Sequence, residues 1–304
     1  MNYSAYPPVF LFGLILFGST FLMGLLLVGV GFFFEKKVDS KRILSQALLT
    51  IIVYFLLISP GIIFKSSVFV LIFFILRELL SYVNALNKPI ISKMLSAMLL
   101  VAVPCFMLIS FYSIALFPFV VILVFLSLIA SVIFLCRFDE IYNALIGITM
   151  IFLILTSLSS ILYLRGKTHG LELCLTVVFL TNISDAFALL GGTFLGKRQL
   201  LPEISPNKTV AGAVIGLLST LMFAFIFNNF LVLGLFWWQI VIMGCVISIS
   251  AQLGDLVASF AKRKAGIKDF GSALPGHGGV LDRCDSLIFS LPATILLLLG
   301  LGTI

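Results

Sequence analysis

The feature that most constrains this chain is a series of long apolar runs with few polar interruptions. A helix needs about 20 predominantly apolar residues to cross a bilayer, and on that measure the sequence predicts about ten spans. The predicted spans are 8–34, 43–64, 66–87, 94–112, 114–136, 143–164, 170–195, 210–227, 230–258 and 286–303. The second and third share a short loop around Lys65 and the ninth is overlong, so nine spans also fit. We therefore expect an all-α, polytopic membrane bundle.

The charge content excludes most other classes. Only 10% of the residues are charged and 62% are hydrophobic, whereas a soluble domain carries about 25% charged residues. An ordinary cytosolic domain and a disordered or fibrous chain are excluded. The apolar runs are continuous rather than alternating, which argues against an outer-membrane β-barrel.

The positions of the basic residues indicate the topology. If the N-terminus is outside, the five inside segments hold 15 of the 19 Lys and Arg residues, against three in the outside loops. This agrees with the positive-inside rule. The net charge of +7 then reflects orientation and lipid headgroups, so no nucleic-acid partner is expected. We expect a multi-pass protein of a bacterial cell (inner) membrane, with its active site facing the cytoplasm.

The two halves of the chain differ in amino-acid composition. Residues 1–165 are mostly plain apolar sequence, which predicts N-terminal scaffold helices facing lipid. Residues 166–304 concentrate Gly, Pro and charged residues, which predicts a C-terminal catalytic region with a signature loop at 259–285. We interpret Arg77–Glu78 in the first half as structural, with a place in the cleft wall as the alternative.

The stretch Gly254–Ser286 carries three carboxylates that could hold a metal. Asp255 stands near the end of an apolar span, where an unpaired carboxylate is costly. Asp282 and Asp285 are three apart and share a face if this segment is a helix. Three such oxygens suit a hard divalent cation such as Mg²⁺, so the sequence predicts a Mg²⁺ site, with a second cation left open.

The same stretch also carries cations and glycines. Glycines let the backbone approach a ligand and donate N–H groups to phosphate oxygens, while basic side chains clamp phosphates. The alternative is that the basic run is a topology signal and that Asp282 and Asp285 only cap a helix. The candidates are Lys262, Arg263, Lys268, His277 and Arg283 for catalysis, and Gly276, Gly278 and Gly279 for substrate binding.

A second polar segment covers 182–209. Asp185 lies within an apolar helix and is a further candidate metal ligand, with a structural ion pair as the alternative. Lys197 ends that helix, and Ser205–Thr209 is expected to form a turn before the next one. Asn207 and Thr209 could cap that next helix. Lys208 would extend toward the same cytoplasmic layer, and Lys197, Ser205, Asn207 and Lys208 are candidate substrate-binding residues.

These two segments resemble the phosphatidate cytidylyltransferase family, also called CDP-diacylglycerol synthases. The motif-bearing resemblance covers about 182–290, and residues 1–165 match only as a multi-span bundle. One departure is Ala258, where many members are expected to carry Glu, which puts the tuning of the metal site in doubt. The motifs are Ser184-Asp185, Ala188, Gly192, Gly196-Lys197, Ser205–Thr209, Ser259, Lys262-Arg263, Lys268-Asp269, Pro275-Gly276-His277-Gly278-Gly279 and Asp282-Arg283-Cys284-Asp285.

The resemblance implies a Mg²⁺-dependent reaction in phospholipid biosynthesis, in which CTP and phosphatidic acid give CDP-diacylglycerol and pyrophosphate. It implies CTP, phosphatidic acid and membrane lipids as partners, and a homodimer is left open. Metal ions would be held by Asp255, Asp282 and Asp285, with Asp185 as a further contact.

Two other functions share some of these features. A different CTP-dependent lipid enzyme, such as one like a polyprenol kinase, would share a basic cytoplasmic cleft, but the Asp-Arg-x-Asp motif argues against it. An ion-coupled transporter could use Asp185 and Asp255 to bind its ion. Transporters often show paired broken helices in both halves, whereas the polar features here lie in one half.

Overall fold

The computed structural model describes residues 52–85, 138–231, 233–272 and 278–303. These residues are mostly helical, which confirms the expected helical class. Four of the described helices are long and apolar enough to cross a membrane: Gly170–Leu195, Val210–Asn229, Trp237–Lys264 and Leu281–Gly300. The predicted spans 8–34, 94–112 and 114–136, with the first part of 43–64 (43–51), lie outside the described residues. The total of nine or ten spans therefore stays a prediction.

Helix α7 (Gly170–Leu195) is the centre of the described bundle and coincides with a predicted span. It contacts α6 (Phe138–Arg165), α8 (Val210–Leu231), α9 (Trp237–Lys264) and α11 (Leu287–Gly300). The most apolar stretch of α7 is 61% buried, against 28% for α8. Because α8 is as apolar as a core helix yet largely uncovered, its outer face suits lipid.

The contact between α7 and α8 depends on small residues. A Cβ atom on Gly216 of α8 would lie 2.7 Å from the carbonyl oxygen of Ser184 on α7, and one on Gly212 would collide with the carbonyl oxygen of Ala188. Glycines four apart let two membrane helices approach until their backbones touch. This close contact fixes where α7 presents Asp185.

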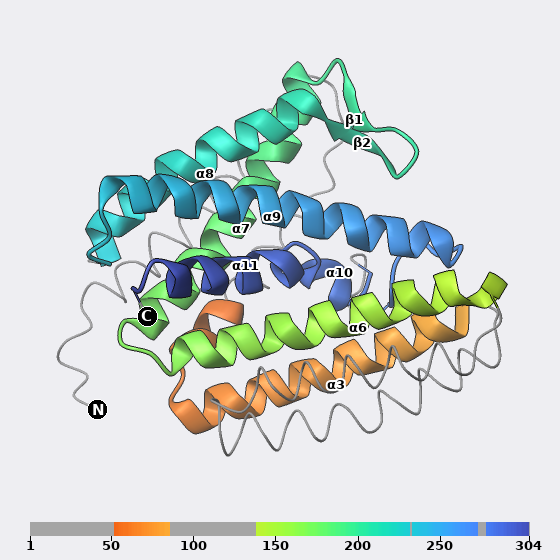
Figure 1. Ribbon diagram of the computed structural model, residues 1–304, viewed down its shortest axis with the longest axis horizontal. Coiled ribbons are helices and arrows are strands. Elements are labelled where there is room, and N and C mark those ends of the chain that lie inside the picture. The colour runs from red at the N-terminus through yellow and green to blue at the C-terminus, as the bar shows by residue number, and fades with distance from the viewer. Residues whose placement is uncertain (1–51, 86–137, 232, 273–277, 304) are drawn as a thin grey trace.

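Helix α3 (Gly61–Ala85) lies beside α6 (Figure 1). The sequence prediction of a break at Lys65 is wrong, because α3 runs through this residue. The break falls at Ser59–Pro60. Proline has no N–H and disfavours the helical conformation of the residue before it, so the preceding helix ends there. The Pro60 carbonyl then accepts a hydrogen bond from the Phe64 N–H at 2.9 Å.

The prediction of a turn at Ser205–Thr209 is also wrong. This segment is strand β2 (Ser205–Thr209), which pairs antiparallel with β1 (Gln199–Leu201) in a hairpin that extends from the bundle (Figure 1). The turn lies between Leu201 and Ile204. A strand accommodates Pro206 because this hairpin is all edge. Thr209 does cap α8, as one of the two expected candidates, by accepting the Gly212 N–H at 3.1 Å.

The chain ends in α9, α10 (Leu281–Cys284) and α11, with α11 packed between α9 and α6 (Figure 1). The predicted span 230–258 begins and ends too early, since α9 continues to Lys264. The basic residues of its last turn favourably face the negative end of the helix dipole. This extension keeps Asp255 and Lys262 on one continuous helix.

We expect Gly216→Ala to destabilise the protein by about 1–3 kcal/mol, because the new methyl group must push α8 off the α7 backbone. Thermal unfolding in detergent measures this. Gly300→Ala is the matched control, since nothing lies within 4 Å of its Cβ position, and we expect a change of at most about 0.5 kcal/mol there. Equal melting temperatures for the two variants would contradict the close contact.

Candidate active site

The last turns of α9 present a polar stripe. Asp255, Ser259 and Lys262 are spaced by four and three residues, so they lie on one face of the helix. The Ser259 hydroxyl donates to Asp255 Oδ1 at 3.3 Å. The other oxygen, Oδ2, lies 2.6 Å from Lys208 Nζ of β2. The hairpin is thus tied to α9 by an ion pair in which the Lys208 nitrogen itself is buried.

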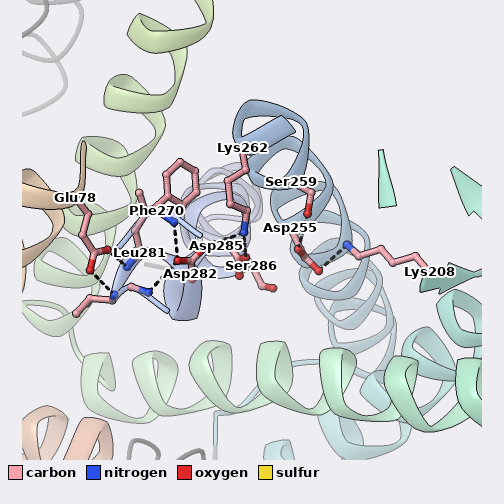
Figure 2. A network of polar contacts seen from close by, with 12 residues as sticks. Glu78, Lys208, Asp255, Ser259, Lys262, Phe270, Leu281, Asp282, Asp285 and Ser286 are labelled. Atoms are coloured by element: carbon pink, nitrogen blue, oxygen red, sulfur yellow. Dashed lines mark hydrogen bonds and ion pairs between the residues drawn. The ribbon is translucent and has the colours of Figure 1, made fainter. Parts of the chain in front are cut away.

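Asp282, at the start of α10, is buried, and both of its carboxylate oxygens accept hydrogen bonds from the protein (Figure 2). Its Oδ1 accepts a hydrogen bond from Lys262 Nζ at 2.8 Å. Its Oδ2 accepts the backbone N–H groups of Phe270 and Gly279 at 2.8 and 2.9 Å. A buried carboxylate requires such donors. Asp282 therefore organises the segment between α9 and α10.

Asp285 also lies near Lys262, with Oδ2 4.0 Å from the ammonium nitrogen. Its Oδ1 accepts the Ser286 N–H at 2.9 Å. The three-residue spacing predicts a shared helix face, and both Asp282 and Asp285 lie beside the Lys262 ammonium group (Figure 2). The Asp285 carboxylate accepts fewer hydrogen bonds from the protein than that of Asp282, so more of it is available to a ligand.

Asp185 of α7 joins this group from a third direction. Its carboxylate lies near the Ser286 side chain and interacts electrostatically with Asp255 and Lys208. Asp285 in turn interacts electrostatically with Asp185 and Asp255. The structure therefore brings together the predicted acids from α7, α9 and the start of the last span. We call Asp185, Asp255 and Asp285 the acidic cluster.

Among the predicted catalytic residues that the structure describes, Lys262 is the most enclosed. Its side chain is only 12% exposed, and its Nζ lies 5.2 Å from the centre of the Phe270 ring. A cation over an aromatic face gains additional electrostatic attraction. The lysine is thus held between two carboxylates and a ring.

The other predicted site residues lie at the border of this centre or outside the described residues. Ser205 is half-buried in β2, and Gly276 and His277 fall within the undescribed 273–277. The exposed side chains are Lys197 after α7, Asn207 in β2, Arg263 at the end of α9, Lys268 in the following loop and Arg283 in α10.

Two glycines of the signature loop, Gly278 and Gly279, are described by the structure. Gly278 has φ +82°, a conformation that favours glycine. The Gly279 N–H, expected to be available for a phosphate oxygen, is donated to Asp282 in this structure. That hydrogen bond must exchange before the amide can bind a ligand.

Sequence reasoning missed the role of Glu78. Arg77 is exposed, whereas Glu78 is 4% exposed, so the two do not form an outward-facing pair. Both Glu78 oxygens accept backbone N–H groups, from Val280 and Leu281, at 2.8 Å each (Figure 2). The only sequence signal for this role was an acidic residue inside an apolar run, and that signal does not indicate which residues the carboxylate binds.

No three His, Cys, Asp or Glu side chains among the described residues form a ready metal-binding group. Mg²⁺ often uses only one or two protein carboxylates and takes its other ligands from water and substrate phosphates. The acidic cluster supplies oxygen donors of this kind, so its chemistry fits the ion. Mg²⁺ itself stays a prediction.

Comparison with known proteins matches a family model described as the cytidylyltransferase family to residues 40–300. Proteins named phosphatidate cytidylyltransferase from Staphylococcus saprophyticus and Staphylococcus haemolyticus are each 41% identical over 133 residues, which is 44% of this chain and 51% of the relative. One from Staphylococcus aureus is 39% identical over 137 residues, or 45% of this chain and 53% of the relative. The chain spans about half the length of the curated relatives it matches.

We expect Lys262→Met to destabilise the protein by about 3 kcal/mol, because it leaves the buried Asp282 carboxylate without its cation. Lys264→Met is the matched control at the same helix end, where the side chain is exposed. Thermal unfolding of the two variants in the same detergent gives the comparison. If both variants melt like the parent protein, the Lys262–Asp282 pair does not stabilise the fold.

Proposed function

Since the chain belongs to the cytidylyltransferase family, we propose that it transfers the cytidylyl group of CTP to phosphatidic acid within the membrane. The products would be CDP-diacylglycerol and pyrophosphate. The observation that supports this most directly is the acidic cluster, in which carboxylates from three helices meet two lysines. The motif resemblance and the names of the relatives point to the same reaction.

The proposed chemistry needs little acid–base catalysis. An oxygen of the lipid phosphate attacks the α-phosphorus of CTP, the bond from that phosphorus to the bridging oxygen breaks, and pyrophosphate leaves with the electron pair. The nucleophile is already an anion. The main barrier is repulsion between phosphates, so the site must supply positive charge where negative charge gathers.

We assign Mg²⁺ to the acidic cluster, where it would neutralise phosphate charge when bound. The described centre contains more acids than lysines, because Lys208 and Lys262 face Asp185, Asp255, Asp282 and Asp285. A divalent cation would balance this excess. We place Asp282 less directly at the ion, since three donors already occupy its oxygens.

The lysines would contact the phosphates. Lys208 lies on the hairpin and can exchange its ion pair with Asp255 for a phosphate oxygen. Lys262 would donate a second N–H to a phosphate oxygen from α9 while it stays paired with Asp282. The exposed Arg263, Lys268 and Arg283 would add positive charge around the pyrophosphate. We assign the remaining predicted residues to CTP binding: Lys197, Ser205, Asn207, Gly276, His277, Gly278 and Gly279.

We propose that this end of the bundle faces the cytoplasm of a bacterial cell. The hairpin, the end of α9 and α10 lie toward one side (Figure 1), and Lys or Arg residues accompany each of them. Such clustering is typical of cytoplasmic segments. CTP would arrive from that side, while the acyl chains of phosphatidic acid remain in the bilayer.

The purified protein should release pyrophosphate from CTP only when phosphatidic acid and Mg²⁺ are both present. We expect Asp285→Asn to lower the rate by about 100-fold or more, because the Mg²⁺ that offsets charge at the reacting phosphates would lose a carboxylate ligand. Glu203→Gln, in the exposed turn of the hairpin, is the matched acid control and should stay within about twofold of the parent rate.

Product analysis separates the competing functions. Release of CDP together with a phosphorylated lipid would identify a kinase and contradict the proposal. A well-folded protein with no lipid-dependent release of pyrophosphate would also contradict it. Removal of Mg²⁺ with a chelator should stop the reaction, and its return should restore the rate.

A further inference from the structure

Glu78 is a buried carboxylate on a helix that otherwise packs apolar side chains. It belongs to α3, far from the signature segment in sequence, and its side chain is almost entirely enclosed. A carboxylate in such a place is costly unless hydrogen-bond donors surround it. The hydrogen-bond donors around Glu78 therefore indicate its role.

The partners of Glu78 are the amides that lead into α10. Oε1 accepts the Val280 N–H and Oε2 accepts the Leu281 N–H. The first N–H groups of a helix have no partner within it. The preceding amide, that of Gly279, is bound by Asp282. Two carboxylates thus hold three consecutive amides and fix the backbone between Gly278 and Asp282.

Two glycines make room for the Glu78 carboxylate. A Cβ atom on Gly271 would lie 2.6 Å from Oε1, and one on Gly279 would collide with Oε2. The loop after α9 and the start of α10 therefore close around this side chain from both sides. Any larger residue at either position must displace the carboxylate.

The same face of α3 makes a second contact with this segment. Tyr82, one helical turn after Glu78, is fully buried and packs edge-on against Phe270 with ring centres 5.5 Å apart. Phe270 in turn donates its N–H to Asp282 and lies beside the Lys262 ammonium. One face of α3 thus contacts the chain at Phe270 and at Val280–Leu281, on either side of the loop that leads to Asp282.

We propose that Glu78 is a positioning residue for the candidate active site. By holding the amides of Val280 and Leu281, it sets the backbone from which Asp282 and Asp285 project toward Lys262. Its effect on catalysis rests on the proposed function. Its effect on the backbone does not, because the hydrogen bonds exist whatever the reaction is.

The test measures amide hydrogen exchange and activity on the same full-length variants. Glu78→Gln keeps the side-chain size but places an NH₂ group against a backbone N–H, so at least one hydrogen bond is lost. Glu78→Asp keeps the charge on a shorter side chain. Arg77→Gln is the matched control, because that side chain is exposed on the same turn of α3.

We expect Glu78→Gln to speed exchange across 278–285 by about tenfold, the equivalent of one lost hydrogen bond. We expect kcat to fall by at least the same factor, with exchange in α7 and α8 unchanged. Glu78→Asp should bring both the exchange rate and kcat part of the way back to the parent values. Arg77→Gln should match the parent protein in exchange rate and in kcat. Gly271→Ala, which crowds Glu78 without removing it, should reproduce the Glu78→Gln pattern more weakly.

The outcomes separate this proposal from the proposed function. Unchanged exchange at 278–285 in Glu78→Gln overturns the proposal, and so does faster exchange with an unchanged kcat. If Glu78→Gln fails to fold, Gly271→Ala and Glu78→Asp decide by the same two criteria. If the parent protein releases no pyrophosphate, the proposed function fails, and the exchange data alone then decide whether Glu78 holds this backbone.

Discussion

The buried carboxylate of Asp282 is the interaction on which the described site depends. It accepts hydrogen bonds from Lys262 on α9, from the Phe270 amide in the loop and from the Gly279 amide before α10. A charge in this position is tolerated only if all such donors are present. The need to satisfy one side chain therefore fixes three separate pieces of chain relative to one another.

The acids of the site divide into two groups by what holds them. Glu78 and Asp282 are held mainly by backbone amides, which cannot leave without unfolding the local chain. Asp255 is held by a lysine and a serine, whose side chains can move. Asp285 likewise faces Lys262 at a longer distance. The first group forms a fixed framework, and the second can exchange partners with a ligand.

The sequence predicted the parts of the fold that depend on composition and short-range spacing. The span 170–195 has the bounds of α7 because its apolar run begins after a polar loop and ends at Gly196. The Asp282–Asp285 spacing predicted a shared helix face, and both side chains reach Lys262. The hairpin and the partners of Glu78 could not be predicted, because the hairpin's strands are short and Glu78 contacts residues about two hundred positions away.

The arrangement of Lys208 and Lys262 explains how such a site can be both stable and ready for a charged substrate. Without phosphates, each ammonium group offsets the repulsion among the carboxylates. Lys208 is on a long, flexible side chain and pairs with the more exposed Asp255, so a phosphate can take it without any movement of α9 or of the amides that Glu78 and Asp282 hold. Lys262 can turn a second N–H toward a phosphate while it keeps its hydrogen bond to Asp282. A preorganised backbone with movable cations costs little reorganisation when the substrate binds, which is the property that electrostatic catalysis requires.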